Sequence, residues 1–348
     1  MSLNSNSVRT EGVWFTEPNK VEVREKEISL PGPDQVMVST LYSAISAGSE
    51  LLLYRGELPD DISLDNSIES LKKGVAYPLQ YGYACVGEVT YIGSQVDRSW
   101  EGRKVFCFHP HESYFLAETK DLLLIPDNVA PSDAIFLPNM ETAVNLIQDG
   151  RPAIGERAVV LGQGVVGLLL AELLSEFPLS SLVVIEKNLE RHRWSKLIGI
   201  DNVCGPDEVL ETDLISLGGA DLLYEVSGNT EALNLAIKLS GYCSRVVIGS
   251  WYGNRAMKVD LGGEAHRNRL QLITSQVSTI EPGLTGRWNK KRRIDLAWEM
   301  IDKVKPSKFI THAVPVREAP SLYRQLSEGT EGLLQVVFEY RDKKVAYV

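Results

Sequence analysis

The stretch AVVLGQGVVG, residues 158–167, decides the fold of this chain. It begins with a short apolar run typical of a buried strand, and an apolar segment of helical character follows its last glycine. Between them stands G-x-G-x-x-G, in the context that a strand–turn–helix unit requires. Gly162 permits the tight turn, Gly164 lets the backbone approach a pyrophosphate, and Gly167 lets the helix pack closely on the strand. The stretch therefore predicts a dinucleotide-binding unit whose phosphates meet the N–H groups of the helix start.

An acidic residue follows at a suitable distance. The second strand, 181–186, ends in Glu186, 19 residues after Gly167 (186 − 167). A carboxylate there can accept both ribose hydroxyls of NAD, and its charge repels the 2′-phosphate of NADP. Lys187 and Arg191 oppose this argument, because a basic pair can hold that phosphate, so we expect NAD(H) to be favoured with NADP(H) as the alternative. The candidate cofactor-binding residues are Gly162, Gln163, Gly164, Val165, Val166, Gly167, Glu186, Lys187, Arg191, Thr142, Ser227 and Gly249.

Strands and helices alternate after residue 134, which is typical of βαβ units with a parallel sheet. The expected strands are 158–161, 181–186, 220–226 and 245–249, and the expected helices are 165–176, 189–197 and 230–239.

The flanking segments have a different character. Residues 11–125 form short apolar stretches between Gly- and Pro-rich turns, which favours a β-rich domain. Residues 291–304 are amphipathic, and 333–340 is an apolar strand. We predict an α/β protein in which a doubly wound parallel sheet is inserted in a β-rich domain. The predicted domains are the first β-rich part (1–139), the dinucleotide-binding domain (140–288) and the return to the β-rich domain (289–348).

Composition limits the class of function. The chain has 348 residues, enough for two domains. Lys plus Arg is 36 and Asp plus Glu is 46, which gives a net charge of −10. Such a surface repels nucleic acid and anionic membranes. The four cysteines lie far apart, and no run approaches the ~20 apolar residues of a membrane helix, so we expect a reducing cytoplasm. Met1–Thr10 is interpreted as a frayed tail, and Glu57–Tyr77 as a surface excursion with a short helix.

The motifs together resemble the medium-chain dehydrogenase/reductase superfamily over about residues 13–340. The resemblance rests on P-G-P-D-Q-V-M-V (31–38), A-G-S-E (47–50), G-Y-A-C-V-G-E-V (82–89), the glycine motif and E-V-S-G (225–228). It implies a GroES-like catalytic domain, a Rossmann domain and hydride transfer between NAD(P) and an alcohol, carbonyl or activated alkene. It also implies a homodimer that pairs edge strands, for which 270–274 is the candidate.

The sequence departs from the zinc alcohol dehydrogenases of that superfamily. Ala47 stands where a cysteine ligand is expected, Tyr83-Ala84 replaces the His-Glu pair, and 137–142 has no cysteine. Methyl and phenol groups cannot supply the donors that zinc needs. We therefore expect no metal. By resemblance, the chain is similar to the zinc-free branch that includes bacteriochlorophyllide a dehydrogenase, and the likeness rests on S-A-I-S-A-G-S-E (43–50), Y-G-Y (81–83), P-N-M-E-T-A (138–143) and S-Q-V (275–277).

Without zinc, hydroxyl donors must stabilise the developing alkoxide. Tyr83 and Ser49 are the first candidates, although a phenol is a weak acid with a reference pKa of about 10. His111 is a second proton carrier, since histidine titrates near neutral pH. Glu141 is a candidate for orienting substrate or cofactor. The structural alternatives are a core tyrosine, a serine bonded to local backbone, a surface or structurally satisfied histidine, and a carboxylate favoured by a helix start.

The leading function is a zinc-independent, NAD(P)(H)-dependent oxidoreductase that acts on a small alcohol or ketone held between the domains. An enone reductase uses the same cofactor geometry and is the alternative within the enzyme class. A non-catalytic nucleotide-binding or redox-sensing protein is the alternative outside it.

Overall fold

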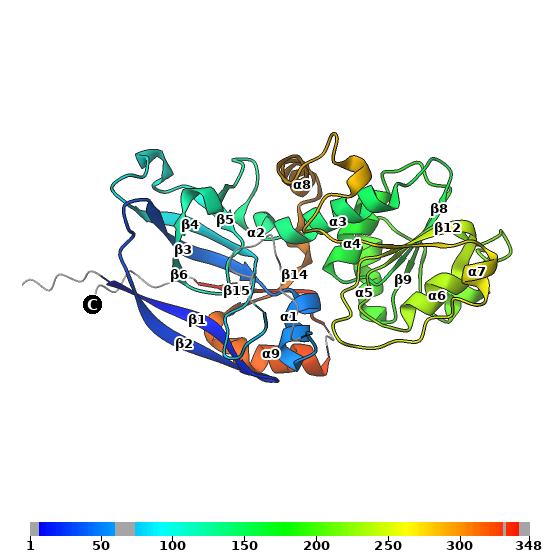
Figure 1. Ribbon diagram of the computed structural model, residues 1–348, viewed down its shortest axis with the longest axis horizontal. Helices are drawn as coiled ribbons and strands as arrows, with labels where there is room; N and C mark the ends of the chain where they lie inside the picture. Colours follow the sequence, from blue (N-terminus) through cyan, green and yellow to red (C-terminus); the bar gives the residue numbers. More distant parts are fainter. Residues whose placement is uncertain (1–6, 60–73, 330–331, 341–348) are drawn as a thin grey trace, which may run out of the picture. The chain divides into compact units, whose positions relative to one another are not determined.

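The computed structural model describes residues 7–59, 74–329 and 332–340. Contacts within the chain define two compact units (Figure 1). Unit 1 comprises residues 1–138 and 301–348, and unit 2 comprises residues 139–300. None of the helices in the described part of the chain has the length and apolarity of a membrane span.

Unit 2 contains a six-stranded sheet in which every pairing is parallel. Its strands lie in the order β10 (Val203–Cys204), β9 (Ser181–Ile185), β8 (Arg157–Leu161), β11 (Ala220–Glu225), β12 (Ser240–Ile248) and β13 (Gln271–Thr274). The helices are α3 (Leu137–Gly150), α4 (Val165–Leu174), α5 (Leu189–Leu197), α6 (Ala232–Leu239), α7 (Glu264–Arg267) and α8 (Lys290–Val304), of which α3 and α8 extend beyond the unit.

The strand order reverses between β8 and β11. From β8 the chain moves through α4 to β9, and from β11 it moves through α6 to β12 on the other side. Right-handed crossovers therefore place α4 and α6 on opposite faces of the sheet. The predicted doubly wound sheet is confirmed, and its switch point lies where the glycine turn leaves β8.

The predicted elements of unit 2 are present with small differences in length. Helix α5 has the predicted bounds, whereas α4 ends at Leu174 instead of residue 176. Strand β12 begins at Ser240, earlier than predicted, and its pairing with β11 is irregular after Ala220. The sequence pattern missed this beginning because Gly241 and Ser244 interrupt the apolar run.

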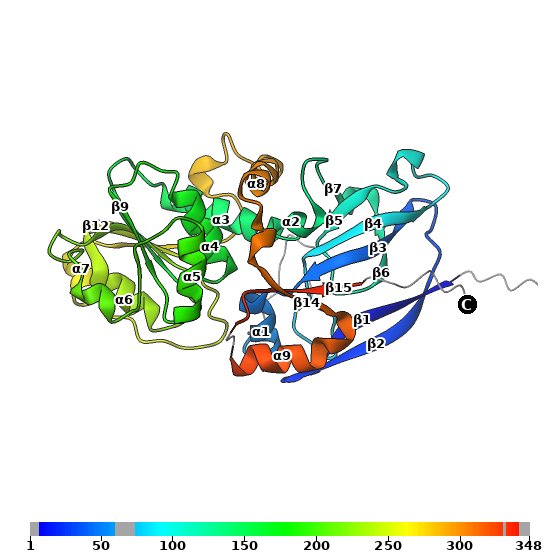
Figure 2. The same ribbon diagram turned by 180° about the vertical axis from the view of Figure 1, so that it is seen from behind.

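Unit 1 is β-rich, as predicted (Figure 2). Its strands are β1 (Ser7–Glu17), β2 (Lys20–Ser29), β3 (Gln35–Ala44), β4 (Cys85–Ile92), β5 (Lys104–Cys107), β6 (Tyr114–Glu118), β7 (Leu123–Leu124), β14 (Ile310–Pro315) and β15 (Gln335–Glu339). Its helices are α1 (Ala47–Arg55), α2 (Pro131–Ala134) and α9 (Ala319–Glu328). Strands β14, β15, β3, β4, β5 and β7 follow one another in one sheet, with β6 paired to β3. The C-terminal β15 pairs with β3, which confirms the predicted return of the chain.

The prediction of a frayed tail is wrong for its second half. Ser7 to Thr10 belong to β1, which pairs with β2, and Thr10 is fully buried. Pairing with a neighbouring strand orders a polar segment that has no hydrophobic run of its own. The predicted surface helix, with Leu64, Ile68 and Leu71, lies outside the described residues.

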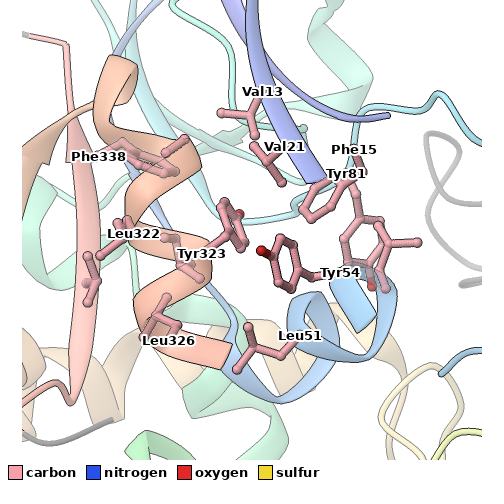
Figure 3. Packing of buried hydrophobic residues seen from close by; sticks show 14 of the residues in the cluster. Val13, Phe15, Val21, Leu51, Tyr54, Tyr81, Leu322, Tyr323, Leu326 and Phe338 are labelled. Carbon is pink, nitrogen blue, oxygen red and sulfur yellow. The ribbon is translucent and has the colours of Figure 1, made fainter. Parts of the chain in front are cut away.

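A hydrophobic cluster in unit 1 joins α1 and α9. Figure 3 shows Tyr323 and Leu326 on α9 near Leu51 and Tyr54 on α1. The Tyr54 and Tyr323 rings are stacked with centroids 5.9 Å apart. This packing fixes α1, whose N-terminal turn carries the candidate residue Ser49.

Tyr224, on β11 of unit 2, has an unsatisfied hydroxyl. The residue is fully buried, and its Oη has no hydrogen-bond partner among the described residues. Because an unpaired buried hydroxyl costs about 1–3 kcal/mol, we expect Tyr224→Phe to raise the free energy of unfolding by about 1 kcal/mol. Urea denaturation measures this change. Tyr323→Phe is the matched control. Because the Tyr323 hydroxyl donates to Glu50, its removal should lower the free energy of unfolding. A loss of stability in Tyr224→Phe would contradict the prediction.

Candidate active site

The three motif glycines of unit 2 have different surroundings. Gly162 has φ +102°, and a Cβ there would lie 2.5 Å from Ser227 Cα. A Cβ on Gly167 would lie 2.0 Å from the Gly162 carbonyl oxygen. A Cβ on Gly164 would meet nothing within 4 Å. Two glycines are thus required by the packing of the chain itself, whereas the third leaves open space where a ligand can approach.

The open glycine lies at the start of α4. Gly164 is the N-cap residue and has no side chain to cap the helix. Val165 and Val166 in the first turn are only half-buried. The first N–H groups of a helix have no intrahelical acceptors, so this turn can donate to an anion.

Glu186 lies beside the glycine turn. Its Oε2 accepts from the Gln163 backbone N–H at 2.7 Å, and its Oε1 accepts from the Asn188 N–H at 2.8 Å. Arg191 Nη1 is 3.8 Å from Oε2, whereas Lys187 is exposed. A carboxylate has about four acceptor sites, so the two oxygens keep capacity for ribose hydroxyls.

Gln163 ties the turn to helix α5. Its side chain is fully buried, and Nε2 donates to the Gly162 carbonyl oxygen at 2.9 Å. Ser195 Oγ, on α5, donates to Gln163 Oε1 at 3.0 Å. The G-x-G-x-x-G motif does not specify the residue at position 163. Nothing in the sequence indicated that Ser195 would donate a hydrogen bond to its side chain.

The ends of β11 and β12 hold a second buried carboxylate. Glu225 Oε1 accepts from the Ser227 N–H at 2.8 Å and from Ser227 Oγ, and Oε2 accepts from the Tyr252 hydroxyl. Burial and the Glu225 charge raise the pKa of Tyr252, so the phenol stays a donor.

Two further candidates are held by the packing of unit 2. A Cβ on Gly249 would lie 2.7 Å from Leu146 Cδ2, so this glycine is needed for close packing. Thr142 is half-buried on α3.

Glu141 is paired within unit 2. Its Oε1 lies 2.9 Å from Lys290 Nζ and 3.0 Å from Arg293 Nη2 and Nε. Arg293 also donates to Asn145 Oδ1 and to the Thr279 carbonyl oxygen. A run of basic residues such as 290–293 is usually a solvated face, but Arg293 is fully buried. A buried charge needs a partner, and Glu141 supplies it from a helix that is distant in sequence.

In unit 1, three hydroxyl groups meet and are called here the hydroxyl cluster: Ser46, Ser49 and Tyr83. The Tyr83 hydroxyl donates to Ser46 Oγ, and Ser49 Oγ lies 3.3 Å from Tyr83 Oη. All three residues are half-buried. The structure thus brings together two of the residues that the sequence nominates for oxygen chemistry, and it adds Ser46.

His111 lies in a different environment. It is fully buried, with Nε2 3.0 Å from Glu50 Oε2 and Nδ1 2.7 Å from Ser43 Oγ. A histidine with both ring nitrogens bonded and no exposure cannot touch a substrate directly. The neighbouring His109 stacks on Phe115, and burial lowers the pKa of His109 to about 4.

Sequence reasoning missed Glu50 and Tyr323. Glu50 stands in a stretch quoted for its family likeness, but nothing in its neighbourhood shows that it is buried. Tyr323 had a usable signal, because Ala319, Leu322, Tyr323 and Leu326 recur at helical spacing after a proline-containing start.

The donor set does not fit zinc. Ala47 has no ligating atom, Tyr83 is bonded to serines, and Glu50 is bonded to His111 and Tyr323. Within the described residues, no group of three or more His, Cys, Asp or Glu side chains is arranged to hold a metal ion.

Sequence comparison finds related dehydrogenases at low identity. D-guloside 3-dehydrogenase of Escherichia coli is 22% identical over 284 residues, covering 77% of this chain and 81% of that protein. The E. coli zinc-type alcohol dehydrogenase-like protein YphC is 23% identical over 356 residues, covering 91% and 96%. The 2-desacetyl-2-hydroxyethyl bacteriochlorophyllide A dehydrogenase of Cereibacter sphaeroides is 24% identical over 262 residues, covering 70% and 75%. No family model matches the chain.

Solved structures share the fold over almost the whole chain. The E. coli RspB alcohol dehydrogenase, complexed with NADH, has a TM-score of 0.77 at 17% identity and covers 96% of this chain and all of its own. A Sinorhizobium meliloti dehydrogenase bound to NADP has a TM-score of 0.75 at 18% identity, with 95% and 99% covered. The fold is therefore that of the alcohol dehydrogenase-like proteins. In sequence and fold the chain resembles the medium-chain dehydrogenase/reductase superfamily, which confirms the expectation from its motifs.

Proposed function

We propose that the chain is an NAD(P)(H)-dependent oxidoreductase of the alcohol dehydrogenase type, acting between an alcohol and its ketone. The observation that carries this proposal is the contrast among the three glycines. Neighbouring atoms of the chain leave no room for a Cβ at Gly162 or Gly167. A Cβ at Gly164 would meet only open space at the start of α4. Relatives and structural neighbours named as dehydrogenases support the reaction class.

The cofactor is proposed to be NAD(H) in preference to NADP(H). The Glu186 charge beside the glycine turn supports this choice, and the nearby Arg191 weakens it by lying 3.8 Å from the carboxylate. The test is a titration of the purified protein with NADH and with NADPH, followed by nicotinamide fluorescence. Tighter NADH binding is expected. Absence of binding for both would end the proposed function.

We propose further that the reaction proceeds without zinc. A nicotinamide held by the glycine turn and Glu186 would supply or accept the hydride, and the hydroxyl cluster would hydrogen-bond the substrate oxygen. In this proposal the Tyr83 phenol turns its O–H from Ser46 Oγ to the substrate oxygen and gives up the proton during reduction, and in oxidation it takes the proton of the alcohol. The half-buried phenol exchanges this proton with solvent between turnovers. Metal analysis of native protein tests this part, since stoichiometric zinc bound beside Tyr83 would contradict it.

Tyr83→Phe removes the proposed proton carrier and keeps the ring. General acid–base catalysis contributes about 10²–10⁴-fold, so we expect kcat to fall by at least about 100-fold. NADH affinity should not change, because the cofactor residues lie in unit 2. Steady-state kinetics with the best substrate of a panel of secondary alcohols and cyclic polyol ketones measures the effect. Tyr242→Phe is the control, since Tyr242 is 68% exposed. Wild-type turnover in Tyr83→Phe would assign the proton to another group.

Two alternative functions predict different experimental results. An enone reductase would reduce the alkene and leave the carbonyl, which product analysis distinguishes. A non-catalytic nucleotide-binding or redox-sensing protein would bind NADH saturably without turnover on any substrate. The hydroxyl cluster favours the oxidoreductase, because a nucleotide-binding protein has no need of it.

We also propose a cytoplasmic homodimer that pairs edge strands. Strand β13 lies at one end of the unit 2 sheet, and its Leu272 is 38% exposed. The acidic net charge disfavours nucleic-acid and membrane partners. Light scattering should give twice 38.6 kDa, and a species of 38.6 kDa alone would remove the proposal.

A further inference from the structure

The Glu50 carboxylate lies beneath the hydroxyl cluster and has no role in the proposed chemistry. Glu50 is in the first turn of α1 and is fully buried. A buried carboxylate is costly unless donors surround it, so its partners show what it holds in place.

Both carboxylate oxygens of Glu50 are occupied. Oε1 accepts from the Ser46 backbone N–H at 2.7 Å. Oε2 accepts from the Tyr323 hydroxyl and lies 3.0 Å from His111 Nε2. Burial, followed by the Glu50 charge, raises the pKa of Tyr323, so that phenol stays protonated and donates.

A second layer fixes His111. Its Nδ1 is 2.7 Å from Ser43 Oγ, which lies 2.9 Å from the Tyr340 hydroxyl. Burial raises the pKa of Tyr340, so it can donate to Ser43. Ser43 then donates to Nδ1, and Nε2–H donates to Glu50. Every group in this chain of hydrogen bonds has a partner in the required direction.

The bond to the Ser46 N–H has a consequence for the serine side chain. Ser46 is the N-cap residue of α1, and an N-cap serine normally uses its hydroxyl to bond the first-turn N–H groups. Here the side chain makes no cap bond. The Ser46 carbonyl accepts from the Glu50 N–H at 2.8 Å, while Glu50 Oε1 holds the Ser46 N–H. Hydrogen bonds to Glu50 therefore hold both the N–H and the carbonyl of Ser46, an arrangement called here the clamp on Ser46. The Ser46 hydroxyl accepts from Tyr83.

We propose that Glu50 is a positioning residue for the hydroxyl cluster: it clamps the Ser46 backbone so that Ser46 Oγ receives the Tyr83 hydroxyl. His111 and Tyr323 hold the carboxylate in the required orientation. The effect on turnover rests on the proposed function, in which Tyr83 carries the proton; the structural link from Glu50 through Ser46 to Tyr83 does not.

Glu50→Gln is the informative variant because it keeps the size of the side chain. An amide accepts on one oxygen only. Its oxygen will face the two donors, His111 and Tyr323, and its NH₂ group will then face the Ser46 N–H. The clamp on Ser46 is lost while the buried layer keeps an acceptor.

The kinetic test is a double-mutant cycle with Glu50→Gln and Ser46→Ala. Loss of positioning should lower kcat by about 10- to 100-fold in each single variant, with KM and NADH affinity unchanged. If Glu50 acts through Ser46, the double variant should be no slower than Ser46→Ala alone. Multiplying effects would mean that Glu50 acts independently of Ser46, and would overturn the proposal. Glu22→Gln, on β2, is the matched control, since the Glu22 side chain is 42% exposed and lies outside the hydroxyl cluster.

A second test requires no turnover. With 3-fluorotyrosine at position 83, the ¹⁹F resonance should move in Ser46→Ala and move similarly in Glu50→Gln. An unchanged resonance in Glu50→Gln would overturn the proposal. If no substrate is turned over, the proposed function fails while this measurement still decides the inference.

A third measurement needs only the wild-type fold and serves if Glu50→Gln does not fold. The Ser46 amide should exchange with solvent on the order of 100-fold more slowly than an unprotected serine amide. Its resonance is assigned in ¹⁵N-serine-labelled protein by its loss in Ser46→Ala. Unprotected exchange would mean that the clamp is absent.

Discussion

Gly164→Val is expected to weaken dinucleotide binding by on the order of 100-fold while the protein stays folded. The backbone at Gly164 is extended, with φ −71°, and a Cβ there meets nothing within 4 Å. A Cβ is therefore accommodated at this position, and a valine side chain should occupy the space that a pyrophosphate needs. Hydrogen bonds to charged groups contribute about 1.5–3 kcal/mol each, so losing one or two weakens NADH binding by on the order of 100-fold. Fluorescence titration and thermal denaturation measure the two properties separately.

Two other glycines provide the comparison. Gly286→Val, at an exposed position with open space around it, should change neither binding nor stability. Gly167→Ala should destabilise unit 2 strongly, because its Cβ would lie 2.0 Å from a backbone oxygen. Normal NADH binding by Gly164→Val would show that the turn does not hold the phosphates.

Arg293→Met is expected to lower the free energy of unfolding by about 3–5 kcal/mol, the usual cost of removing one partner of a buried ion pair. Arg293 is fully buried and 3.0 Å from Glu141. Methionine fills part of the volume but leaves Glu141 with the partly exposed Lys290 alone. The acceptors Asn145 Oδ1 and the Thr279 carbonyl oxygen also lose a donor. Urea denaturation monitored by circular dichroism measures the change.

Lys291→Met, in the same helix α8, is the matched control. Its side chain is 83% exposed and pairs with Asp295, so the variant should stay within about 0.5 kcal/mol of wild type. Adding Glu141→Gln to Arg293→Met should recover part of the lost stability, because the unpaired charge is removed. Equal stability of Arg293→Met and Lys291→Met would contradict the role of the buried pair.

The cofactor unit could be predicted because its signals are local. A strand, a glycine turn and a helix follow one another within twenty residues, and each glycine answers a steric need in that short span. Helix α5 has the bounds expected from the sequence, and the expected alternation of strands with helices is present. The start of β12 was missed because Gly241 and Ser244 interrupt the apolar pattern.

The candidate chemistry was only partly accessible. Tyr83 and Ser49 were nominated from separate segments, and the structure places their hydroxyl oxygens 3.3 Å apart. His111 was nominated for its residue type alone, and the structure buries it against Glu50. A histidine in an extended segment gives no sign of which face it turns inward, so its burial could not be read from its neighbours.

Sequence alone determined the parallel sheet, the glycine turn and the acid at the end of the second strand, since each depends on residues close together in the chain. Tertiary structure alone decided which charges are buried and what satisfies them. Glu50 takes partners 61 and 273 residues away, and Glu141 takes Arg293 from 152 residues away. Such pairings follow from how whole elements pack, and the free energy of a buried charge depends on a partner that no local pattern specifies.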